Sequence, residues 1–351
     1  MIFCKIVGLL RGGGGRKIIH IYDNIISFDN LLISWREFLR GKKKRKDVAI
    51  FQLHFMDNIL LLHQELRNKT YHHGGYKAFK INDPKPRDIH KASVRDRLVH
   101  HAIYRKIYPF FDRLFIYDSY SCRINKGTHR AINRFRYFSS KVSKNNTKTC
   151  WVLKCDIKKF FANIDHKILK NILGKHIKDE NTFWLLSQII DSFDKGLPLG
   201  NLTSQLLVNI YMNEFDQFIK RRLKIKYYIR YADDFVIFSR DKIFLEKLIL
   251  EISDFLEQHL KLSLHPNKLS IETISSGIDF LGWIIFPKHM ILRTKTKKRI
   301  FYRLEQNYNE QSLASYSGLL SHGNAFGLSN KILREYKSKL NKKTASYEVV
   351  F

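Results

Sequence analysis

The stretch "IRYADDFVIFSR", residues 229–240, places two adjacent aspartates, Asp233 and Asp234, inside an apolar and aromatic run. Carboxylates are costly to bury unless they are paired or bind a metal ion. The pattern predicts two short strands joined by a tight turn at Ala232 and Asp233. Aspartate is common in tight turns, so the pair alone fits a purely structural turn as well as a functional site.

A third carboxylate occurs in a similar setting. Asp156, in "LKCDIKKFF" (153–161), also follows an apolar strand and is followed by lysines and aromatic residues. Hard oxygen ligands of this kind select Mg²⁺ or Mn²⁺ over zinc. Two such ions about 3.5–4 Å apart activate an attacking hydroxyl and stabilise a leaving phosphate. The three aspartates together therefore indicate phosphoryl transfer.

The charge of the chain indicates the class of partner. The 351 residues include 63 Lys and Arg against 32 Asp and Glu, a net charge of +31. An excess of this size favours a polyanionic partner, because each neutralised phosphate releases counterions. The basic residues are spread along the chain rather than gathered on one amphipathic helix, which favours nucleic acid over the competing interpretation, a membrane surface.

Cysteine spacing and hydropathy indicate the compartment. The four cysteines form no C-x-x-C pair, which argues against a disulfide framework and a zinc ribbon and fits a reducing cytoplasm. The first ten residues are too short to span a membrane and lead into four glycines instead of a cleavage site. No later apolar run reaches about 18 residues, so we expect a cytoplasmic protein without a transmembrane helix.

Local patterns predict the order of the elements. Helical spacing of apolar residues covers most of 28–71, and 76–111 indicates a strand, a turn and a helix capped by Ser93. A strand ends near Asp156, a long helix follows the loop 196–201, and 278–286 is expected to form one strand. Strands that alternate with helices, with several hairpins, predict an α+β fold in which an antiparallel sheet packs on helices.

Several of these segments resemble the motifs of one family. "YADD" between apolar strands resembles the central metal-binding hairpin of reverse transcriptases. Six further segments are similar to motifs of this family and occur in its order: 86–107 (fingers), 120–132, 156–166 (first palm aspartate), 196–216 (the loop and helix at the templating pair), 264–272 and 277–283. The resemblance implies a right-hand polymerase fold with fingers, palm and a short helical thumb, and the activity of an RNA-directed DNA polymerase.

One motif distinguishes groups within the family. Group II intron and retron enzymes usually have Q-G-x-x-x-S-P where this chain has "LGNLTSQ", residues 199–205. That substitution resembles the reverse transcriptases of diversity-generating retroelements, as do residues 28–51 and 315–328. The resemblance implies four parts: a flexible lead (1–19), a helical extension (20–78), fingers and palm (79–290) and a basic helical thumb (291–351).

The resemblance also implies roles for single residues. Asp156, Asp233 and Asp234 would bind two Mg²⁺ ions, with Mn²⁺ as the alternative, and Ile157 would add a backbone carbonyl. Lys268 would protonate the departing pyrophosphate. Around the incoming nucleotide, Arg87 and Arg95 would hold the triphosphate, Phe161 would exclude a 2′-hydroxyl, and Leu199, Gly200 and Gln205 would lie against the nascent base pair.

The implied partners are a template RNA, a primer or growing cDNA, deoxynucleoside triphosphates and a small basic accessory protein that forms oligomers. The implied source is bacterial, archaeal or phage. Leu199 cannot form the hydrogen bond that glutamine would offer to the nucleotide, so we expect low fidelity, with errors at template adenines. The alternatives are a group II intron or retron enzyme of ordinary fidelity and a non-catalytic RNA-binding protein on a polymerase fold. A nucleobase deaminase is excluded because its zinc motif is absent.

Overall fold

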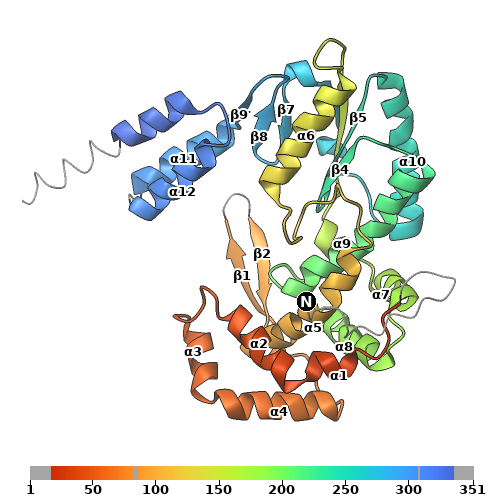
Figure 1. The fold of residues 1–351 in the computed structure, drawn as a ribbon, viewed down its shortest axis with the longest axis vertical. Coiled ribbons are helices and arrows are strands. Elements are labelled where there is room, and N and C mark those ends of the chain that lie inside the picture. Colours follow the sequence, from red (N-terminus) through yellow and green to blue (C-terminus); the bar gives the residue numbers. More distant parts are fainter. Residues whose placement is uncertain (1–16, 83–85, 307–308, 336–351) are drawn as a thin grey trace, which may run out of the picture.

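The computed structural model describes residues 17–82, 86–306 and 309–335 (Figure 1). Almost all of the lead predicted for residues 1–19, and the last 16 residues of the predicted thumb, lie outside this part of the chain. The division of the chain into four parts remains a prediction. Within the described residues, helices and antiparallel sheets combine into the α+β fold expected from the sequence.

The N-terminal part is helical, as the apolar spacing predicts. It consists of α1 (Tyr22–Ile26), α2 (Phe28–Phe38), α3 (Lys46–Leu53) and α4 (Phe55–Arg67). Helix α2 packs mainly against α5 (Val94–Asp112). The carboxylate of Asp179 accepts hydrogen bonds from the backbone N–H groups of Ile21 and Tyr22 over 2.7 and 2.8 Å. Asp179 is the N-cap of α8 (Glu180–Asp191), so these bonds connect the start of α1 to the N-terminus of that helix.

A two-stranded hairpin precedes α5. Strands β1 (Lys77–Ile81) and β2 (Arg87–Lys91) pair antiparallel and stand clear of the helices around them (Figure 1). Helix α5 begins after Ser93, whose hydroxyl accepts the N–H of Asp96 over 3.1 Å, so the predicted cap is confirmed.

The central sheet has the order β4-β5-β3-β6 and is antiparallel throughout. Its strands are β3 (Trp151–Asp156), β4 (Tyr228–Tyr231), β5 (Asp234–Ser239) and β6 (Ser270–Thr273). Successive side chains of β5 enter two different cores: Phe235 and Ile237 face one core, and Val236 and Phe238 face the other. Because both faces are covered, the strands are apolar runs with little polar alternation.

Helices cover the two faces of this sheet. On one face lie α7 (His166–His176), α8 (Glu180–Asp191), α9 (Leu202–Gln217) with its π-helical end η2 (Phe218–Arg222), and α10 (Lys242–Leu260). On the other face lies α6 (Thr128–Val142). Short 3₁₀ turns lie between β3 and α7 (η1, Phe160–Asn163), between α10 and β6 (η3, Pro266–Lys268) and after β6 (η4, Ile274–Ser276).

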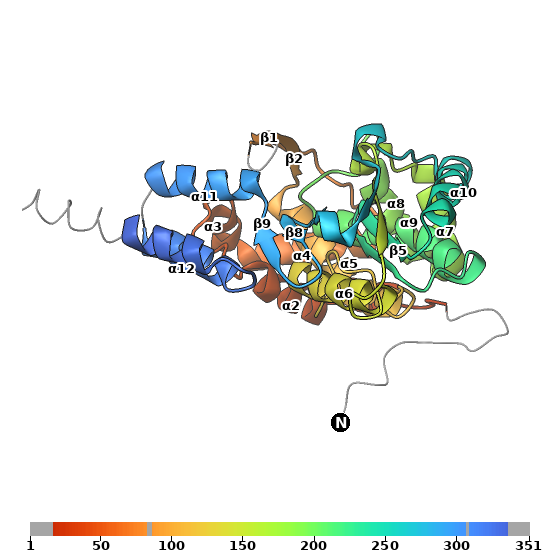
Figure 2. The ribbon, with the colours of Figure 1, turned by 90° about the horizontal axis from the view of Figure 1, so that it is seen from above.

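The C-terminal part contains a three-stranded sheet and two helices. Strands β7 (Ile278–Phe280), β8 (Trp283–Ile285) and β9 (Met290–Leu292) precede α11 (Thr294–Gln306) and α12 (Glu310–Leu320), which lie side by side away from the central sheet (Figure 2). The single strand expected over 278–286 is therefore wrong. Leu281 and Gly282 both have positive φ, +50° and +90°, and form a tight turn that makes the segment a hairpin.

Within the described residues, no helix is both long and apolar enough to cross a lipid bilayer. Cys122, Cys150 and Cys155 are free thiols.

Candidate active site

The turn between β4 and β5 carries Asp233, and Asp234 is the first residue of β5, as the sequence predicts. Tyr231 pairs with Asp234, so only Ala232 and Asp233 form the turn. Ala232 has φ +56°, in the left-handed region that L-residues seldom occupy. Such conformations persist where the surrounding structure enforces them, and they gather at functional sites.

The three predicted metal ligands come together. Asp156 is the last residue of β3 and is the register partner of Asp234 on β5. Asp156 is 7% exposed, and its backbone carbonyl accepts the N–H of His265 over 2.8 Å. Antiparallel register thus brings residues 78 positions apart in the chain to neighbouring places at one end of the sheet.

The carboxylates affect one another strongly. Burial, followed by the charges of Asp233 and Asp156, raises the pKa of Asp234 to about 7. Burial and then the charge of Asp156 also raise the pKa of Asp233. Like charges in a partly buried place favour the protonated form. A cation bound here would relieve that repulsion.

The donor set fits a hard divalent cation. All three side chains offer only carboxylate oxygens, the ligands that Mg²⁺ and Mn²⁺ prefer. Lys268 Nζ donates to Asp156 Oδ1 over 2.7 Å. In the described part of the chain no three His, Cys, Asp or Glu side chains are already arranged as a finished metal site. The carboxylates could therefore bind a metal ion only after side-chain adjustment, with the lysine giving up its place at Asp156.

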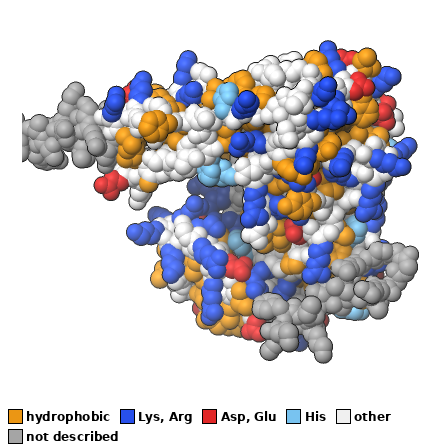
Figure 3. Space-filling view, turned by 45° about the horizontal axis from the view of Figure 1, so that its top comes forward, with side chains coloured by type: hydrophobic (Ala, Val, Ile, Leu, Met, Phe, Trp, Pro, Cys, Tyr) orange, Lys and Arg blue, Asp and Glu red, His pale blue; other side chains and the backbone are white. Residues whose placement is uncertain are grey.

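A cavity of about 1090 Å³ opens beside the carboxylates. Strand β2, the central sheet and α11 all contribute to its lining, which includes Asp156, Asp234, Lys268, Arg87, Lys154, Asp279, Arg293, Lys298 and Arg299. In the space-filling view a recess separates the arm that carries α11 and α12 from the rest of the molecule, and Lys and Arg side chains border it (Figure 3). The recess therefore offers a positive channel for a polyanion that ends at a negative point.

Arg87 and Arg95 lie in different surroundings. Arg87 begins β2, lines the cavity, and its charge opposes the rise in the pKa of Asp233. Arg95 instead forms an ion pair with Glu65 and donates to the carbonyl of His72 over 3.1 Å. The structure thus brings Arg87 to the aspartates and ties Arg95 to the N-terminal helices. The triphosphate role of both residues remains a prediction.

The loop before α9 packs against the β1–β2 hairpin. The carbonyl of Leu199 accepts the N–H of His90 over 2.9 Å, and Asn201 Nδ2 donates to the His90 carbonyl over 3.1 Å. Gly200 has φ +111°, and a Cβ there would lie 2.8 Å from Ile89 Cγ2. The glycine thus permits a close approach of loop and hairpin that another residue would prevent.

One buried side chain of this region, that of Asn201, has a polar atom without a hydrogen-bond partner in the described part of the chain. Asn201 is 2% exposed, and its Oδ1 has no hydrogen-bond partner among the described residues. Buried polar atoms are normally satisfied, so this oxygen can accept a hydrogen bond from a ligand. Gln205 lies one turn further along α9 and is half-buried.

Phe161 and Ile157 flank Asp156 in the chain. Phe161 is half-buried in η1, where its ring centroid lies 5.5 Å from that of the fully packed Phe160. The N–H of Leu197 donates to the Phe161 carbonyl over 2.8 Å, which joins this turn to the loop before α9. Ile157 is 1% exposed and pairs with Leu264 in an isolated bridge. Its side chain serves the core, so only its backbone could contact a cation.

Sequence reasoning singles out neither Lys154 nor the basic residues of α11 that line the cavity. Lys154 lies two residues before Asp156 on β3, and its charge opposes the rise in the pKa of Asp234. The position of Lys154 could have been predicted from the two-residue period of the strand, which puts the side chains of Lys154 and Asp156 on one face of the sheet.

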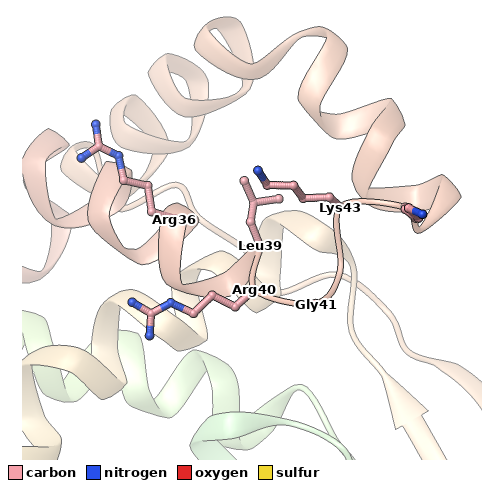
Figure 4. A pocket seen from close by; sticks show the side chains of 6 residues that line it. Arg36, Leu39, Arg40, Gly41 and Lys43 are labelled. Carbon is pink, nitrogen blue, oxygen red and sulfur yellow. The ribbon is translucent and has the colours of Figure 1, made fainter. Parts of the chain in front are cut away.

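A second hollow lies on the N-terminal helices, at the end of α2. It is lined by Arg36, Leu39, Arg40, Gly41, Lys43 and Lys44 (Figure 4). It contains no carboxylate and holds about 590 Å³. It is a basic surface feature, and it lacks the acidic centre that distinguishes the first cavity.

A family model described as reverse transcriptase (RNA-dependent DNA polymerase) matches residues 80–285, more than half of the chain. The matched range covers the end of β1 and all of β2, all three aspartates and Lys268.

Curated proteins from several organisms are similar to this chain. Protein YkfC of Escherichia coli K12 is 26% identical over 281 residues, which cover 67% of this chain and 72% of that protein. Group II intron-encoded protein LtrA of Lactococcus lactis is 27% identical over 181 residues, which cover 47% of this chain and 28% of LtrA. The putative COX1/OXI3 intron 2 protein of Saccharomyces cerevisiae is 22% identical over 277 residues, 60% of this chain and 30% of that protein. The chain thus spans less than a third of two of these three relatives.

Solved structures share the fold. Telomerase from Candida albicans, in complex with a fragment of telomeric RNA, superposes with a TM-score of 0.51 at 12% identity and covers 79% of this chain and 57% of its own. The corresponding Candida tropicalis complex gives a TM-score of 0.50 at 14% identity and covers 82% and 57%. At these identities the likeness concerns the fold alone, and it agrees with the α+β polymerase architecture.

Proposed function

We propose, from the premise that this chain belongs to the reverse transcriptase (RNA-dependent DNA polymerase) family, that it copies a template RNA into DNA. The observation that carries the proposal is the pairing of Asp156 with Asp234 beside the Ala232–Asp233 turn, at the end of a basic cavity. A non-catalytic RNA-binding protein would gain from the basic lining, but it would have no use for three carboxylates that repel one another.

The chain's own residues then have defined roles. Asp156, Asp233 and Asp234 would hold two Mg²⁺ ions, or Mn²⁺, which when bound activate a hydroxyl and neutralise triphosphate charge. Arg87 would hold triphosphate oxygens with its planar fork. Lys268, once displaced from Asp156 by the cation, would carry the proton that the leaving pyrophosphate takes up.

Two further residues would select the substrate. The Phe161 ring would lie under the sugar and exclude a 2′-hydroxyl, so deoxynucleotides would be preferred. The close approach at Gly200 would let the loop backbone lie against the nascent base pair. The partners in this proposal are the template RNA, a primer and deoxynucleoside triphosphates.

We further propose that the enzyme is of the diversity-generating type and copies adenines with errors. Support comes from Leu199, which replaces the glutamine usual in group II intron and retron enzymes. An aliphatic side chain cannot hydrogen-bond the incoming nucleotide, so less free energy separates correct from incorrect pairs. A small basic accessory protein, and a bacterial, archaeal or phage source, belong to this same proposal.

Primer extension on a defined RNA template, with deoxynucleotides and Mg²⁺ and with the product sequenced, tests both the polymerase activity and the proposed low fidelity. The Asp233→Asn/Asp234→Asn double variant is the control for catalysis, and Leu199→Gln is the control for fidelity. Errors concentrated opposite adenine that fall several-fold in Leu199→Gln would support the diversity-generating type. Faithful copying by the wild type would contradict the diversity-generating type and would indicate a reverse transcriptase of ordinary fidelity. If no extension occurs even with cognate RNA and accessory protein, the RNA-binding alternative replaces the proposal.

A further inference from the structure

A fully buried ion pair lies behind the turn that carries the aspartates. Arg230 on β4 and Asp216 on α9 are both 0% exposed. Arg230 Nε donates to Asp216 Oδ1 over 2.8 Å, and Nη2 donates to Oδ2 over 2.7 Å, so the contact is bidentate. Tyr228 also donates its hydroxyl to Asp216 Oδ1 over 2.7 Å. Nothing in the catalytic roles assigned above uses this pair.

All five N–H donors of the Arg230 guanidinium form hydrogen bonds. Arginine has five N–H donors in a rigid plane. Besides the two that bind Asp216, Nη1 donates to Asn209 Oδ1 over 3.2 Å and to the Ala232 carbonyl over 3.1 Å, and Nη2 donates to Ser119 Oγ over 3.1 Å. The plane is therefore fixed by α9 and by the segment before α6, and one of its donors is directed at the turn.

Stability does not explain why a charge pair occupies this place. A buried ion pair can often be replaced by apolar side chains of similar volume without loss of stability, because desolvation offsets the attraction. Asp216 also neutralises the charge of Arg230, so the effect of the arginine on the turn is mainly a directed hydrogen bond. What the pair supplies, and an apolar core would not, is a rigid donor to the Ala232 carbonyl.

That carbonyl belongs to the residue that shapes the turn. Ala232 has φ +56° and immediately precedes Asp233 and Asp234. The backbone of Arg230 is held as well: its N–H donates to the Asp118 carbonyl and its carbonyl accepts the N–H of Tyr120, each over 3.0 Å. Both the strand before the turn and the turn itself are thus fixed to the body of the protein.

We propose that Arg230 is a positioning residue that fixes the left-handed Ala232 turn and thereby holds Asp233 and Asp234 in the arrangement that binds a divalent cation with Asp156. Asn209, Ser119 and Asp216 act through Arg230 by holding its guanidinium. The inference rests on the proposed function only in taking the carboxylates to be cation ligands. It concerns cation affinity, which can be measured without template, primer or nucleotide.

The variant that tests this is Arg230→Met/Asp216→Leu, which removes both charges together and leaves apolar side chains in the space. Removing only Arg230 would leave a buried, unpaired Asp216 and endanger folding. Arg230→Lys is the second variant, because lysine keeps the charge opposite Asp216 but lacks the planar fork. The matched control is Arg97→Met/Asp47→Leu, which removes an ion pair between α5 and α3 that does not touch the turn.

The probe is Mn²⁺ alone, and its binding is followed by electron paramagnetic resonance, with thermal unfolding as the check of the fold. Asp234→Asn defines the signal that comes from the carboxylates. We expect both Arg230 variants to weaken this binding at least tenfold with thermal midpoints near that of the wild type, and the control to bind as the wild type does. If the double variant does not fold, Arg230→Lys decides.

Wild-type Mn²⁺ affinity in a folded Arg230 variant would overturn the inference, since the arginine would then be structural only. Absence of Asp234-dependent Mn²⁺ binding in the wild type would overturn it too. The two proposals fail in different experiments. A protein that binds Mn²⁺ through Asp234 and Arg230 but extends no primer would contradict the polymerase and leave the positioning role standing.

Discussion

Asp156 and Asp234 are register partners across β3 and β5, at one end of the central sheet. Burial and the charges of Asp233 and Asp156 raise the pKa of the Asp234 carboxyl to about 7, so the site opposes the ionisation of its own carboxylates. Asp233 adds a third negative charge at the turn. Without a cation the site therefore costs stability, as expected of residues placed for chemistry.

Lys268 offers a test of proton donation. If its ammonium serves as general acid, Lys268→Met should slow extension by about 10²-fold or more. Lys268→Arg should remain slow, because a guanidinium hardly gives up a proton. Single-turnover rates across pH check this. Full activity in Lys268→Arg would show that only the charge beside Asp156 matters.

Phe161 and Phe160 are adjacent rings with different expected roles. Phe161→Ala should let ribonucleotides compete with deoxynucleotides at least tenfold better, because the bulk under the sugar is lost. Phe160 is 3% exposed and belongs to the core, so Phe160→Ala should lower the free energy of unfolding by about 3–5 kcal/mol and leave sugar selection unchanged. Competing incorporation assays and urea unfolding separate the two. Equal selectivity in Phe161→Ala would assign its ring to packing.

A substitution at Gly200 tests the contact between the β1–β2 hairpin and the loop before α9. An alanine there meets Ile89 Cγ2 at 2.8 Å on a backbone with φ +111°, so Gly200→Ala should raise the KM for deoxynucleotides about tenfold or more. The control is Gly75→Ala, where a Cβ would meet nothing within 4 Å. Steady-state extension at varied nucleotide concentration gives both constants. Identical constants in the two variants would contradict the role assigned to this loop.

The protonation of His101 should lower the free energy of unfolding in acid. Burial and the nearby cations Lys42 and Arg97, only partly opposed by Glu37, lower its pKa to about 4. The unfolded chain, with a histidine pKa near 6.5, binds the proton first, so stability falls as pH drops from about 6.5 toward 4. In urea unfolding at pH 5–7, His101→Gln should reduce this slope by up to about 1.4 kcal/mol per pH unit. An unchanged slope would contradict the assigned pKa.

The local features of the fold followed from the sequence. The turn at Ala232, the cap at Ser93 and the alternation of strands and helices are set by residues within a few positions of one another. The hairpin at 278–286 was not predicted. Its turn places Leu281 at positive φ, and leucine gives no signal for such a turn.

Contacts between distant segments could not be predicted from local sequence patterns. Arg95 lies in a basic motif, yet it forms an ion pair with Glu65, 30 residues earlier in the chain. Asp216 looks like one more acid on a helix, and only the fold brings it to Arg230. The available signal was the arginine itself, which lies in an otherwise apolar and aromatic strand, three residues before Asp233.

We propose that the paired aspartates catalyse RNA-directed DNA synthesis. The rate of primer extension on an RNA template by the wild type and by Asp234→Asn, with folding and RNA affinity measured on the same samples, tests this proposal. Asp234→Asn should lose at least about 10³-fold in rate, while its RNA affinity is unchanged and its thermal midpoint in chelator is equal to or above that of the wild type. A variant that extends within tenfold of the wild-type rate would contradict the catalytic role of the aspartates.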